Sequence, residues 1–380
     1  MVNSNTNALG IIFPNSYDSW VSELVNVRLM ASIPFASRYR LIDFILSSMT
    51  NCDIGNVSIM VNNNYHSLMD HLGSGREWDL VRKNGGLNIF PPFAEKDSKP
   101  YVGRVGALAG ILDFLRDQKE EYVFMTDTNI AVNFDFKAML KTHIESGADV
   151  TIAYNEQELP ECIKQNSSPS KGFYYTFDIE DSKVTKIYVN SKESGVQNFS
   201  MNIFVLKRDL LIDLIDEAFV HGHQYFERDI LLPKLNQLKV YAYKCEGYIA
   251  RICDLKSYYD ENMKLLDDYN LNALFSGPSI YTKLHGGNPA RYMGGSKVQD
   301  VMAADGCIIE GEVENSILFR SVKIAKGAKV KNCILMQGTV VEAGADIEYL
   351  VTDKNVTITA GKEMKGTDTF PVYISKFQTV

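Results

Sequence analysis

Asp127 is the carboxylate whose position in this sequence best suits ligand chemistry. It follows the apolar run Tyr122–Met125, which has the length and composition of a buried strand. In open α/β sheets, ligands bind in the crevice beyond the carboxyl ends of the strands. The sequence therefore predicts that the Asp127 carboxylate faces a ligand site.

Positive charge that could accompany this carboxylate lies in the first third of the chain, on Arg28, Arg38, Arg40 and Arg104. The chain of 380 residues as a whole is acidic, with a formal net charge of −8. A protein that binds the phosphate backbone of nucleic acids needs a basic face, so we expect no nucleic-acid partner. A local basic pocket for a small phosphorylated ligand is compatible with this composition.

The six cysteines form no C-x-x-C pair and have no histidines at metal-ligand spacing. We therefore expect free, buried thiols in a reducing cytoplasm, and no metal site. The N-terminus lacks the basic and apolar segments of a signal peptide. No run approaches the roughly 18 apolar residues of a membrane span. These features predict a cytoplasmic protein without membrane contact.

Strands and helices must alternate to position these residues. Five short apolar runs are typical of buried strands: Ala8–Phe13, Val57–Val61, Tyr122–Met125, Asp149–Tyr154 and Met201–Leu206. Between them, Ala107–Gln118 and Phe136–Glu145 have helical spacing, and Gly147 is a suitable C-cap. This alternation predicts an α/β domain over residues 1–276, with a Rossmann-like, mostly parallel sheet.

The C-terminal part of the chain repeats. An aliphatic-x-x-Gly motif recurs with starts 17 residues apart, at Ile324-Ala-Lys-Gly327, Val341-Glu-Ala-Gly344 and Ile358-Thr-Ala-Gly361. Six-residue steps, three to a coil, are typical of a parallel β-helix. Three hexads would give 18 residues, and the pattern does not explain the missing one. We predict a glycine-rich linker at 277–296 and a β-helix domain at 297–380, the alternative being a small antiparallel β domain.

Several motifs resemble those of the ADP-glucose pyrophosphorylases, a family of sugar-1-phosphate nucleotidyltransferases. Residues 34–44 (PFASRYRLIDF) resemble the family segment P-F-G-G-K-Y-R-L-I-D-F. His66-Ser-Leu68, Trp78-Asp-Leu80 and Phe90-Pro-Pro92 resemble the elements S-H-x-L, W-D-L and L-P-P, in the same order. The hexad repeats resemble the left-handed β-helix of the family. The resemblance covers nearly the whole chain and implies a nucleotidyltransferase domain followed by that β-helix.

The family joins glucose 1-phosphate to ATP, and this reaction needs a glycine-rich loop whose backbone N–H groups cradle the triphosphate. Here the corresponding residues 15–20 read NSYDSW, and no glycine lies between Gly10 and Gly55. Bulky side chains prevent close approach of backbone to phosphate. Asp18 would also add negative charge beside a triphosphate. The resemblance therefore implies that the loop has lost this role.

The cations that the family places around its phosphates are also replaced. Trp20 stands where the family has an arginine, and Met30 stands where it has a lysine. Val189 and Asn190 replace the glutamate and lysine that hold the sugar phosphate. Arg28 is retained, as a remnant of the site or as a solvated surface arginine.

The metal-binding carboxylates of the family are reduced to one. Asp127 aligns with the aspartate of S-G-D-H, which the resemblance implies as a Mg²⁺ ligand. Arg251 replaces the second aspartate, and a guanidinium repels a cation. Asp254, three residues further on, is not expected to substitute. Asp127 is thus expected to be a polar residue at a strand end.

With these residues replaced, the chain resembles the non-catalytic subunits that accompany catalytic ADP-glucose pyrophosphorylase subunits in bacteria. Each lost electrostatic contact is typically worth about 10²-fold or more in rate. The resemblance implies a regulatory subunit of glycogen biosynthesis with no catalytic residue, metal or cofactor of its own. It implies a hetero-oligomer, expected to be a tetramer, whose catalytic partner binds Mg²⁺.

Two other functions stay open at this stage. The chain could transfer a nucleotidyl group by altered chemistry that uses the four arginines and Asp127. It could also bind a sugar-phosphate effector, because Arg38 aligns with the basic residue that the family uses for phosphorylated activators, with Arg40 and His66 nearby. The alternative is that Arg38 and Arg40 form charge pairs on the surface and bind no ligand.

Overall fold

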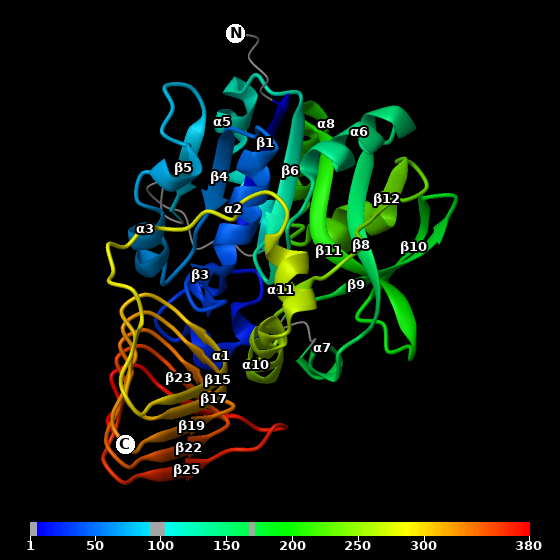
Figure 1. Cartoon of the computed structure of the whole chain (residues 1–380). Helices are drawn as coiled ribbons and strands as arrows, with labels where there is room; N and C mark the ends of the chain where they lie inside the picture. The colour runs from blue at the N-terminus through cyan, green and yellow to red at the C-terminus, as the bar shows by residue number, and fades with distance from the viewer. Residues whose placement is uncertain (1–5, 92–102, 167–171) are drawn as a thin grey trace.

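The computed structural model describes residues 6–91, 103–166 and 172–380, so Pro92 of the third motif lies outside the described residues. The chain forms an α/β domain with a β-helix below it in the view of Figure 1. Within the described residues, nine strands form the central sheet, in the order β5 (Gly86–Phe90), β4 (Asn56–Met60), β1 (Ala8–Phe13), β6 (Tyr122–Asp127), β11 (Val196–Lys207), β8 (Val150–Glu158), β12 (Val240–Lys244), β10 (Lys183–Val189) and β9 (Tyr175–Glu180).

The two halves of this sheet differ in strand direction. Strands β5, β4, β1 and β6 are parallel, as the alternation of strands and helices predicts. Strand β11 then enters antiparallel to both β6 and β8, so the complete sheet is mixed. The carboxyl ends of β1 and β6 lie side by side, because Phe13 pairs with Asp127. This pairing places Asp127 beside the loop that follows β1.

The predicted elements are found with small shifts in their ends. Strand β1 has its predicted bounds, and the predicted helix at 107–118 is divided into α4 (Gly103–Ala109) and α5 (Leu112–Asp117). Helix α6 (Phe136–Ser146) begins at the N-cap Asp135 and ends at Gly147, whose φ is 61°. A glycine adopts this left-handed conformation without steric cost.

Helices cover both faces of the sheet because side chains alternate along each strand. Leu9 and Ile11 of β1 pack with α4, α5 and α8 (Arg208–Val220) on one face. Ile12 of β1 packs with α2 (Leu41–Asn51) and α6 on the other face. The shorter elements are α1 (Ser22–Val25), α3 (His66–Leu72), α7 (Glu161–Asn166), α9 (Leu232–Lys234), α10 (Leu255–Met263), α11 (Asp268–Phe275), β2 (Pro34–Phe35), β3 (Tyr39–Arg40), β7 (Ile130–Ala131) and β13 (Ala250–Arg251).

The C-terminal domain is a left-handed parallel β-helix, in which every pairing between named strands is parallel. One face holds β14 (Arg291–Tyr292), β16 (Ile308–Ile309), β18 (Lys323–Ile324), β21 (Val340–Val341) and β24 (Thr357–Ile358). Strands β15 (Lys297–Ala303) and β17 (Glu312–Leu318) span the other two faces, which continue with β19 (Lys329–Lys331), β22 (Asp346–Glu348) and β25 (Glu363–Lys365), and with β20 (Ile334–Leu335), β23 (Leu350–Thr352) and β26 (Val372–Ile374). Because β14 lies within 277–296, the predicted linker is shorter than expected.

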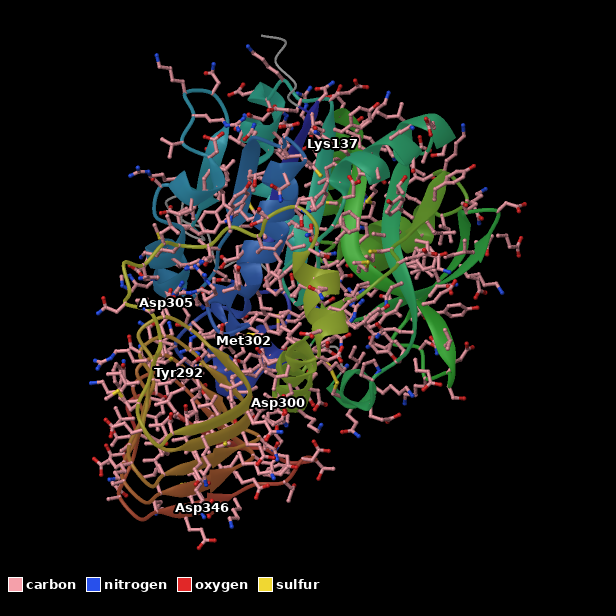
Figure 2. The ribbon with its side chains drawn as sticks, viewed as in Figure 1. Lys137, Tyr292, Asp300, Met302, Asp305 and Asp346 are labelled. Atoms are coloured by element: carbon pink, nitrogen blue, oxygen red, sulfur yellow. A yellow bond between two sulfur atoms is a disulfide. The ribbon has the colours of Figure 1, made fainter. Side chains whose placement is uncertain are left out.

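The coils stack away from the α/β domain, with Met302 on an upper coil and Asp346 near the bottom of Figure 2. The structure explains the 17-residue repeat. Inward-facing Ile324, Val330, Leu335 and Val341 are spaced by six, five and six residues, so one corner is a residue short. The residues at that corner in successive coils, Asn315, Asn332 and Tyr349, have φ values of 43°, 51° and 54°. We attribute the shorter turn to this left-handed backbone.

The two domains share one hydrophobic cluster. Tyr258 and Tyr259 of α10 pack against β-helix residues such as Ile317 and Ile334. The Tyr259 hydroxyl donates a hydrogen bond of 2.9 Å to the Asn332 carbonyl. The β-helix is therefore docked on the α/β domain through a buried apolar interface.

Candidate functional site

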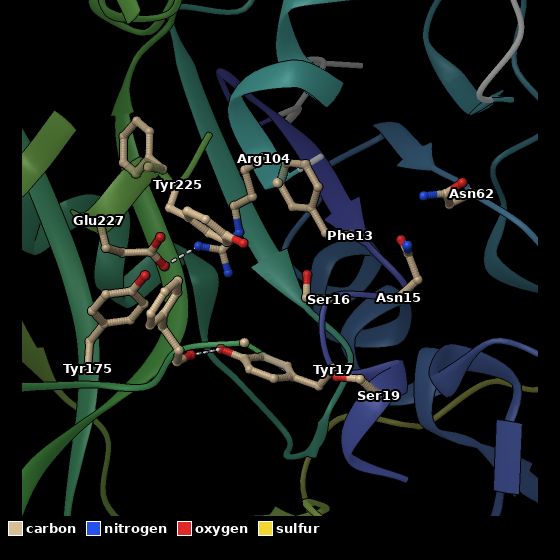
Figure 3. Close-up of a pocket in the computed structure, with 14 residues that line it drawn as sticks. Phe13, Asn15, Ser16, Tyr17, Ser19, Asn62, Arg104, Tyr175, Tyr225 and Glu227 are labelled. Atoms are coloured by element: carbon tan, nitrogen blue, oxygen red, sulfur yellow. Dashed lines mark hydrogen bonds and ion pairs between the residues drawn. The ribbon is translucent and has the colours of Figure 1, made fainter. Parts of the chain in front are cut away.

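A cavity of about 290 Å³ opens at the carboxyl end of β1 and is called the central pocket here (Figure 3). Its lining consists of Phe13, Asn15, Ser16, Tyr17, Ser19, Asn62, Gly103, Arg104, Gly172, Phe173, Tyr175, Tyr225, Phe226 and Glu227. The loop after β1 contributes four of these residues, so the pocket lies where the sequence predicts a ligand site. The loop presents side chains to the cavity, as expected for a segment without glycine.

Asp127 lies behind the lining of the central pocket, with both carboxylate oxygens engaged. Ser16 Oγ donates a hydrogen bond of 2.7 Å to Asp127 Oδ1. Arg104 Nη2 lies 2.5 Å from Asp127 Oδ2, and Arg104 Nη1 contacts Glu227 Oε1. All three charged side chains are buried. Burial opposes the charge of Arg104, but Asp127 and Glu227 outweigh it and raise the guanidinium pKa above its usual value.

This arrangement does not fit a divalent cation. A Mg²⁺ ion needs free carboxylate oxygens in octahedral geometry. Here the nearest carboxylates already bind a guanidinium, which repels a second cation. The resemblance implied Asp127 as a Mg²⁺ ligand, but the guanidinium of Arg104 lies against this carboxylate in place of a metal ion.

Arg251, at the position of the second carboxylate, is a buried structural residue. It donates hydrogen bonds of 3.1 Å to the Ser200 carbonyl and 2.9 Å to Asn155 Oδ1. Its guanidinium carbon lies 3.9 Å from the centre of the Phe199 ring. Burial lowers its pKa to about 10. Arg251 thus joins β13 to β8 and β11, and it is not part of the lining of the central pocket.

Asp18, Trp20 and Met30 close the loop on itself. The Met30 backbone N–H donates a hydrogen bond of 2.8 Å to Asp18 Oδ1. Burial raises the pKa of Asp18 to about 7, although the Met30 hydrogen bond opposes this rise. The buried Trp20 ring packs on Tyr17 with a centroid distance of 4.3 Å. These contacts hold the loop through its own side chains.

Arg28 has a role that neither sequence interpretation foresaw. It is not solvated, and it does not line the central pocket. Its Nη2 lies 2.6 Å from Oδ1 of Asp353 in the β-helix. The Tyr373 hydroxyl donates a hydrogen bond of 2.8 Å to the other Asp353 oxygen. Arg28 is therefore a buried link between the two domains.

Val189 is the last residue of strand β10, and Asn190 directly follows it. Val189 pairs with Tyr175 of β9 and packs against the core. Asn190 has a φ of 54°, and its Oδ1 accepts a hydrogen bond of 2.9 Å from the Tyr174 backbone N–H. Both residues serve a turn, and neither supplies a cation for a sugar phosphate.

A second cavity of about 170 Å³ lies between the two domains and is called the basic pocket here. Its lining consists of Pro34, Ser37, Arg38, Tyr39, Arg40, Asp70, His71, His285, Phe319, Arg320, Gln337 and Lys354. Arg38 and Arg40 are thus brought together, as predicted. His66, the third predicted effector residue, is exposed and outside the lining. Arg320 and Lys354 are cations that the sequence interpretation missed.

A signal for the missed cations was present in the repeats. Arg320, Gln337 and Lys354 are 17 residues apart, so successive coils place them in one column along a corner of the β-helix. This column faces Arg38 and Arg40 only because the β-helix docks at this place on the α/β domain. Motif comparison within the first domain could not have found it.

The charges of the basic pocket are not balanced by the protein. Arg320 Nε and Nη2 are buried and have no hydrogen-bond partner within the described chain. Burial and the neighbouring Arg40 and Arg28 lower the pKa of Lys354 to about 7. Burial also lowers the pKa of Arg40 to about 10, despite the nearby Asp43. Such mutual repulsion is relieved by a bound anion.

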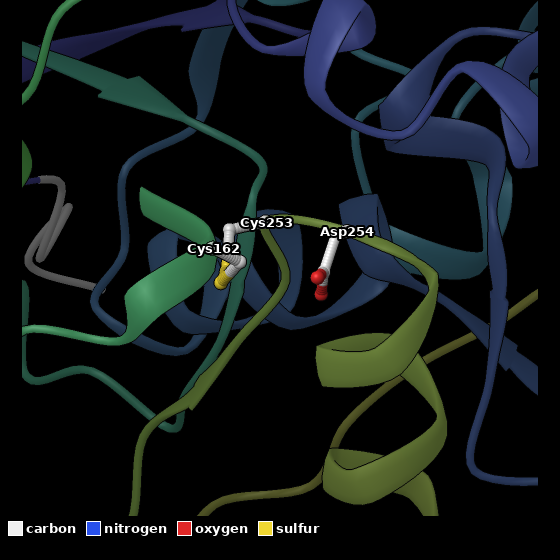
Figure 4. Close-up of side chains that lie close together, drawn as sticks. All are labelled: Cys162, Cys253 and Asp254. Carbon is white, nitrogen blue, oxygen red and sulfur yellow. A yellow bond between two sulfur atoms is a disulfide. The ribbon is translucent and has the colours of Figure 1, made fainter. Parts of the chain in front are cut away.

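The prediction that all cysteines are free is wrong. Cys162 of α7 and Cys253, which are 91 residues apart in sequence, form a disulfide with 6.5 Å between their Cα atoms (Figure 4). The fold brings these distant segments together, which no spacing rule could show. Asp254 lies beside the disulfide but is the N-cap of α10. Its Oδ1 accepts a hydrogen bond of 2.7 Å from the Ser257 backbone N–H. The other four cysteines are free.

Within the described residues, no helix has the length and apolarity needed to cross a bilayer. The sequence profile of the family described as "Nucleotidyl transferase" matches residues 27–267. The profile described as "GlmU-like, C-terminal hexapeptide" matches residues 289–369. Both matches agree with the two domains of the structure.

Individual relatives confirm the resemblance found in the sequence. The glycogen biosynthesis protein GlgD of Bacillus subtilis (strain 168) is 34% identical over 98% of this chain and 96% of its own length. The GlgD protein of Geobacillus stearothermophilus is 35% identical over 86% of this chain and 83% of its own length. The glucose-1-phosphate adenylyltransferase of Geobacillus stearothermophilus is 31% identical over 79% of this chain and 76% of its own length.

Proposed function

Because this chain belongs to the nucleotidyl transferase family, within the group that holds GlgD and glucose-1-phosphate adenylyltransferase, we propose that it is a regulatory, non-catalytic subunit of that enzyme in bacterial glycogen biosynthesis. One observation carries the proposal. The only carboxylate retained from the expected metal pair, Asp127, is buried with its oxygens held by Ser16 and Arg104.

The surroundings of Asp127 support this proposal. Nucleotidyl transfer needs cations at the reacting phosphates and a metal ion between them. The guanidinium of Arg104 pairs with the carboxylates of Asp127 and Glu227 instead. The loop after β1 offers an acid, Asp18, in place of a phosphate cradle. A chain with this site can hold its fold but lacks the groups for turnover.

The proposed partner is a catalytic paralogue that carries the intact motifs and binds Mg²⁺. We expect the two chains to form a hetero-oligomer in the cytoplasm, with a tetramer as the simplest assembly. The conserved architecture would let this chain take a catalytic subunit's place beside the partner. Contacts between the subunits would then shift the partner toward its active conformation.

Reconstitution tests this proposal. Purified chain is mixed with the catalytic paralogue, and pyrophosphate release from ATP and glucose 1-phosphate is measured together with co-elution. Co-elution and a higher rate than the paralogue alone are expected. Asp127→Asn in this chain should leave the gain in rate unchanged, with Asp113→Asn, at an exposed carboxylate, as the matched control. Turnover by the isolated chain, abolished by Asp127→Asn, would overturn the proposal in favour of altered chemistry.

A second function, effector binding, is favoured by the unpartnered Arg320 in the basic pocket. We propose that the guanidinium groups of Arg38, Arg40 and Arg320 and the amine of Lys354 bind a phosphorylated sugar between the domains. Calorimetric titration with a sugar bisphosphate should show binding that Arg320→Gln weakens at least tenfold. Arg116→Gln, at an exposed arginine of α5, should not change it. Equal binding by the wild type and Arg320→Gln would contradict the assignment.

A further inference from the structure

The charged groups of the central pocket are committed to one another. Arg104 binds both Asp127 and Glu227, which leaves this trio with one excess negative charge. Arg228, close to the aromatic wall, pairs with Asp229 at 2.6 Å. Arg251, which does not line the pocket, donates its hydrogen bonds to Ser200 and Asn155. Within the described residues, a phosphate entering this cavity therefore meets no uncommitted arginine.

Aromatic rings form much of the wall that remains. They are contributed by Phe13, Tyr17, Phe173, Tyr175, Tyr225 and Phe226. Phe173 and Tyr225 meet edge to face, with centroids 4.8 Å apart. Figure 3 shows the rings of Tyr17, Tyr175 and Tyr225 grouped around Arg104 and Glu227. Rings of this kind bind the apolar faces of flat or cyclic ligands.

Hydrogen-bonding groups surround the aromatic wall. Asn15 and Asn62 border the cavity on the side of β1, and Ser16 lies near its centre in Figure 3. Neutral amides and hydroxyl groups can both donate and accept, so they suit hydroxyl groups on a ligand. The cavity volume of about 290 Å³ is sufficient for one small cyclic compound.

We infer that the central pocket binds an uncharged ring compound that carries hydroxyl groups, either a free sugar or a nucleoside. Binding needs no metal ion, because the guanidinium of Arg104 already pairs with Asp127 and Glu227. The inference rests on the proposed function, since a chain that made ADP-glucose would need phosphates and Mg²⁺ in this pocket. It also gives the pocket a role in a regulatory subunit. An occupied pocket would report the presence of the neutral compound to the assembled enzyme.

Paired titrations of the Arg320→Gln chain test the inference, because this variant weakens the other phosphate site. Methyl α-glucoside is compared with glucose 1-phosphate, and adenosine with ATP, each with Mg²⁺ and with EDTA, by calorimetry. At least one neutral compound should bind at least tenfold more tightly than its phosphorylated counterpart, equally with and without Mg²⁺. The neutral compound that binds identifies the ligand as a sugar or a nucleoside. Tighter binding of the phosphorylated compounds, a requirement for Mg²⁺, or no binding of either neutral compound would overturn the inference.

Two variants locate the binding. Tyr225→Ala removes a ring from the pocket wall and should weaken the neutral ligand at least tenfold, whereas Tyr269→Ala, at a tyrosine that is 80% exposed, should not. Arg104→Gln should free the two carboxylates and create binding of Mn²⁺, measured by electron paramagnetic resonance, that Arg116→Gln does not create. An unchanged affinity in Tyr225→Ala contradicts the assigned site even if Arg104→Gln fails to fold. Reconstitution with the paralogue is scored separately, so loss of the inference leaves the proposed function testable.

Discussion

The central pocket and the basic pocket use arginine in opposite ways. In the central pocket, Arg104 is enclosed by two carboxylates that neutralise it. In the basic pocket, Arg38, Arg40, Arg320 and Lys354 face one another, and the nearby Asp70 pairs with Lys283. An arginine with internal partners contributes to the fold, whereas an arginine that repels its neighbours indicates a ligand.

This difference also bears on the proposed loss of catalysis. The central pocket lies where the resemblance places the family's chemistry, and Arg104, Asp127 and Glu227 are paired with one another there. The basic pocket lies at the domain boundary, where Arg28 and Asp353 hold the two domains together nearby. Lys354 directly follows Asp353, and its backbone N–H donates a 2.6 Å hydrogen bond to the Asp353 carboxylate. The proposed anion site is therefore adjacent to the contact between Arg28 and Asp353 that links the two domains.

The largest expected effect is the loss of protein stability when Arg104 of the central pocket is replaced. Arg104→Met leaves the carboxylates of Asp127 and Glu227 buried without a counter-charge, and breaking a buried pair costs about 3–5 kcal/mol. We expect the free energy of unfolding in urea to fall by that amount. The triple variant Arg104→Met, Asp127→Asn, Glu227→Gln should recover much of it. An Arg104→Met chain as stable as the wild type would show that the charges are not structural.

A smaller effect is expected for Asp18. Burial raises its pKa to about 7, well above the usual value for aspartic acid, so the folded chain favours the protonated acid. The free energy of unfolding should therefore fall as the pH rises from about 4 to about 7. Asp18→Asn can still accept the Met30 hydrogen bond and should be more stable by about 1–2 kcal/mol near pH 8, but not near pH 4. Thermal unfolding at both pH values measures this, with Asp113→Asn as the exposed control.

Removing an arginine from the basic pocket should not destabilise the protein, in contrast to removing Arg104 from the central pocket. Arg320→Gln removes a cation that repels its neighbours, so the free energy of unfolding is expected to stay equal or to rise slightly. Sulfate binding should weaken at least tenfold, equivalent to about 1.4 kcal/mol. Urea unfolding and calorimetry measure the two quantities on the same sample. A loss of stability as large as that of Arg104→Met would remove the distinction between the two pockets.

The smallest effect concerns the pH dependence of anion binding. Lys354 has a pKa lowered to about 7, so it loses its charge as the pH rises through neutrality. Burial lowers the pKa of His71 and His285, which moves the titration of both side chains to lower pH. Sulfate keeps its charge near neutrality, and its affinity should fall a few-fold between about pH 6 and pH 8. Lys354→Arg should flatten this dependence, whereas Lys297→Arg, on an exposed face of the β-helix, should not.

Local patterns were enough for the main elements. The strand β1, the helix α6 and the repeats of the β-helix follow from hydrophobic spacing, caps and glycine positions, all of which act within a few residues. The length of the coil did not follow, because the short corner depends on left-handed φ values at Asn315, Asn332 and Tyr349. A side chain such as tyrosine gives no sequence signal for that conformation.

The sequence by itself determined the two-domain architecture, the family and the absence of glycine from the loop after β1, since these depend on which residues occupy each position. Only the tertiary structure decided which charged side chains and which cysteines are paired. Arg28 with Asp353, Arg104 with Glu227 and Cys162 with Cys253 are separated by 325, 123 and 91 residues in sequence. Whether a buried charge is neutralised or left to a ligand depends on distances of a few ångströms, and only the packed fold sets these distances.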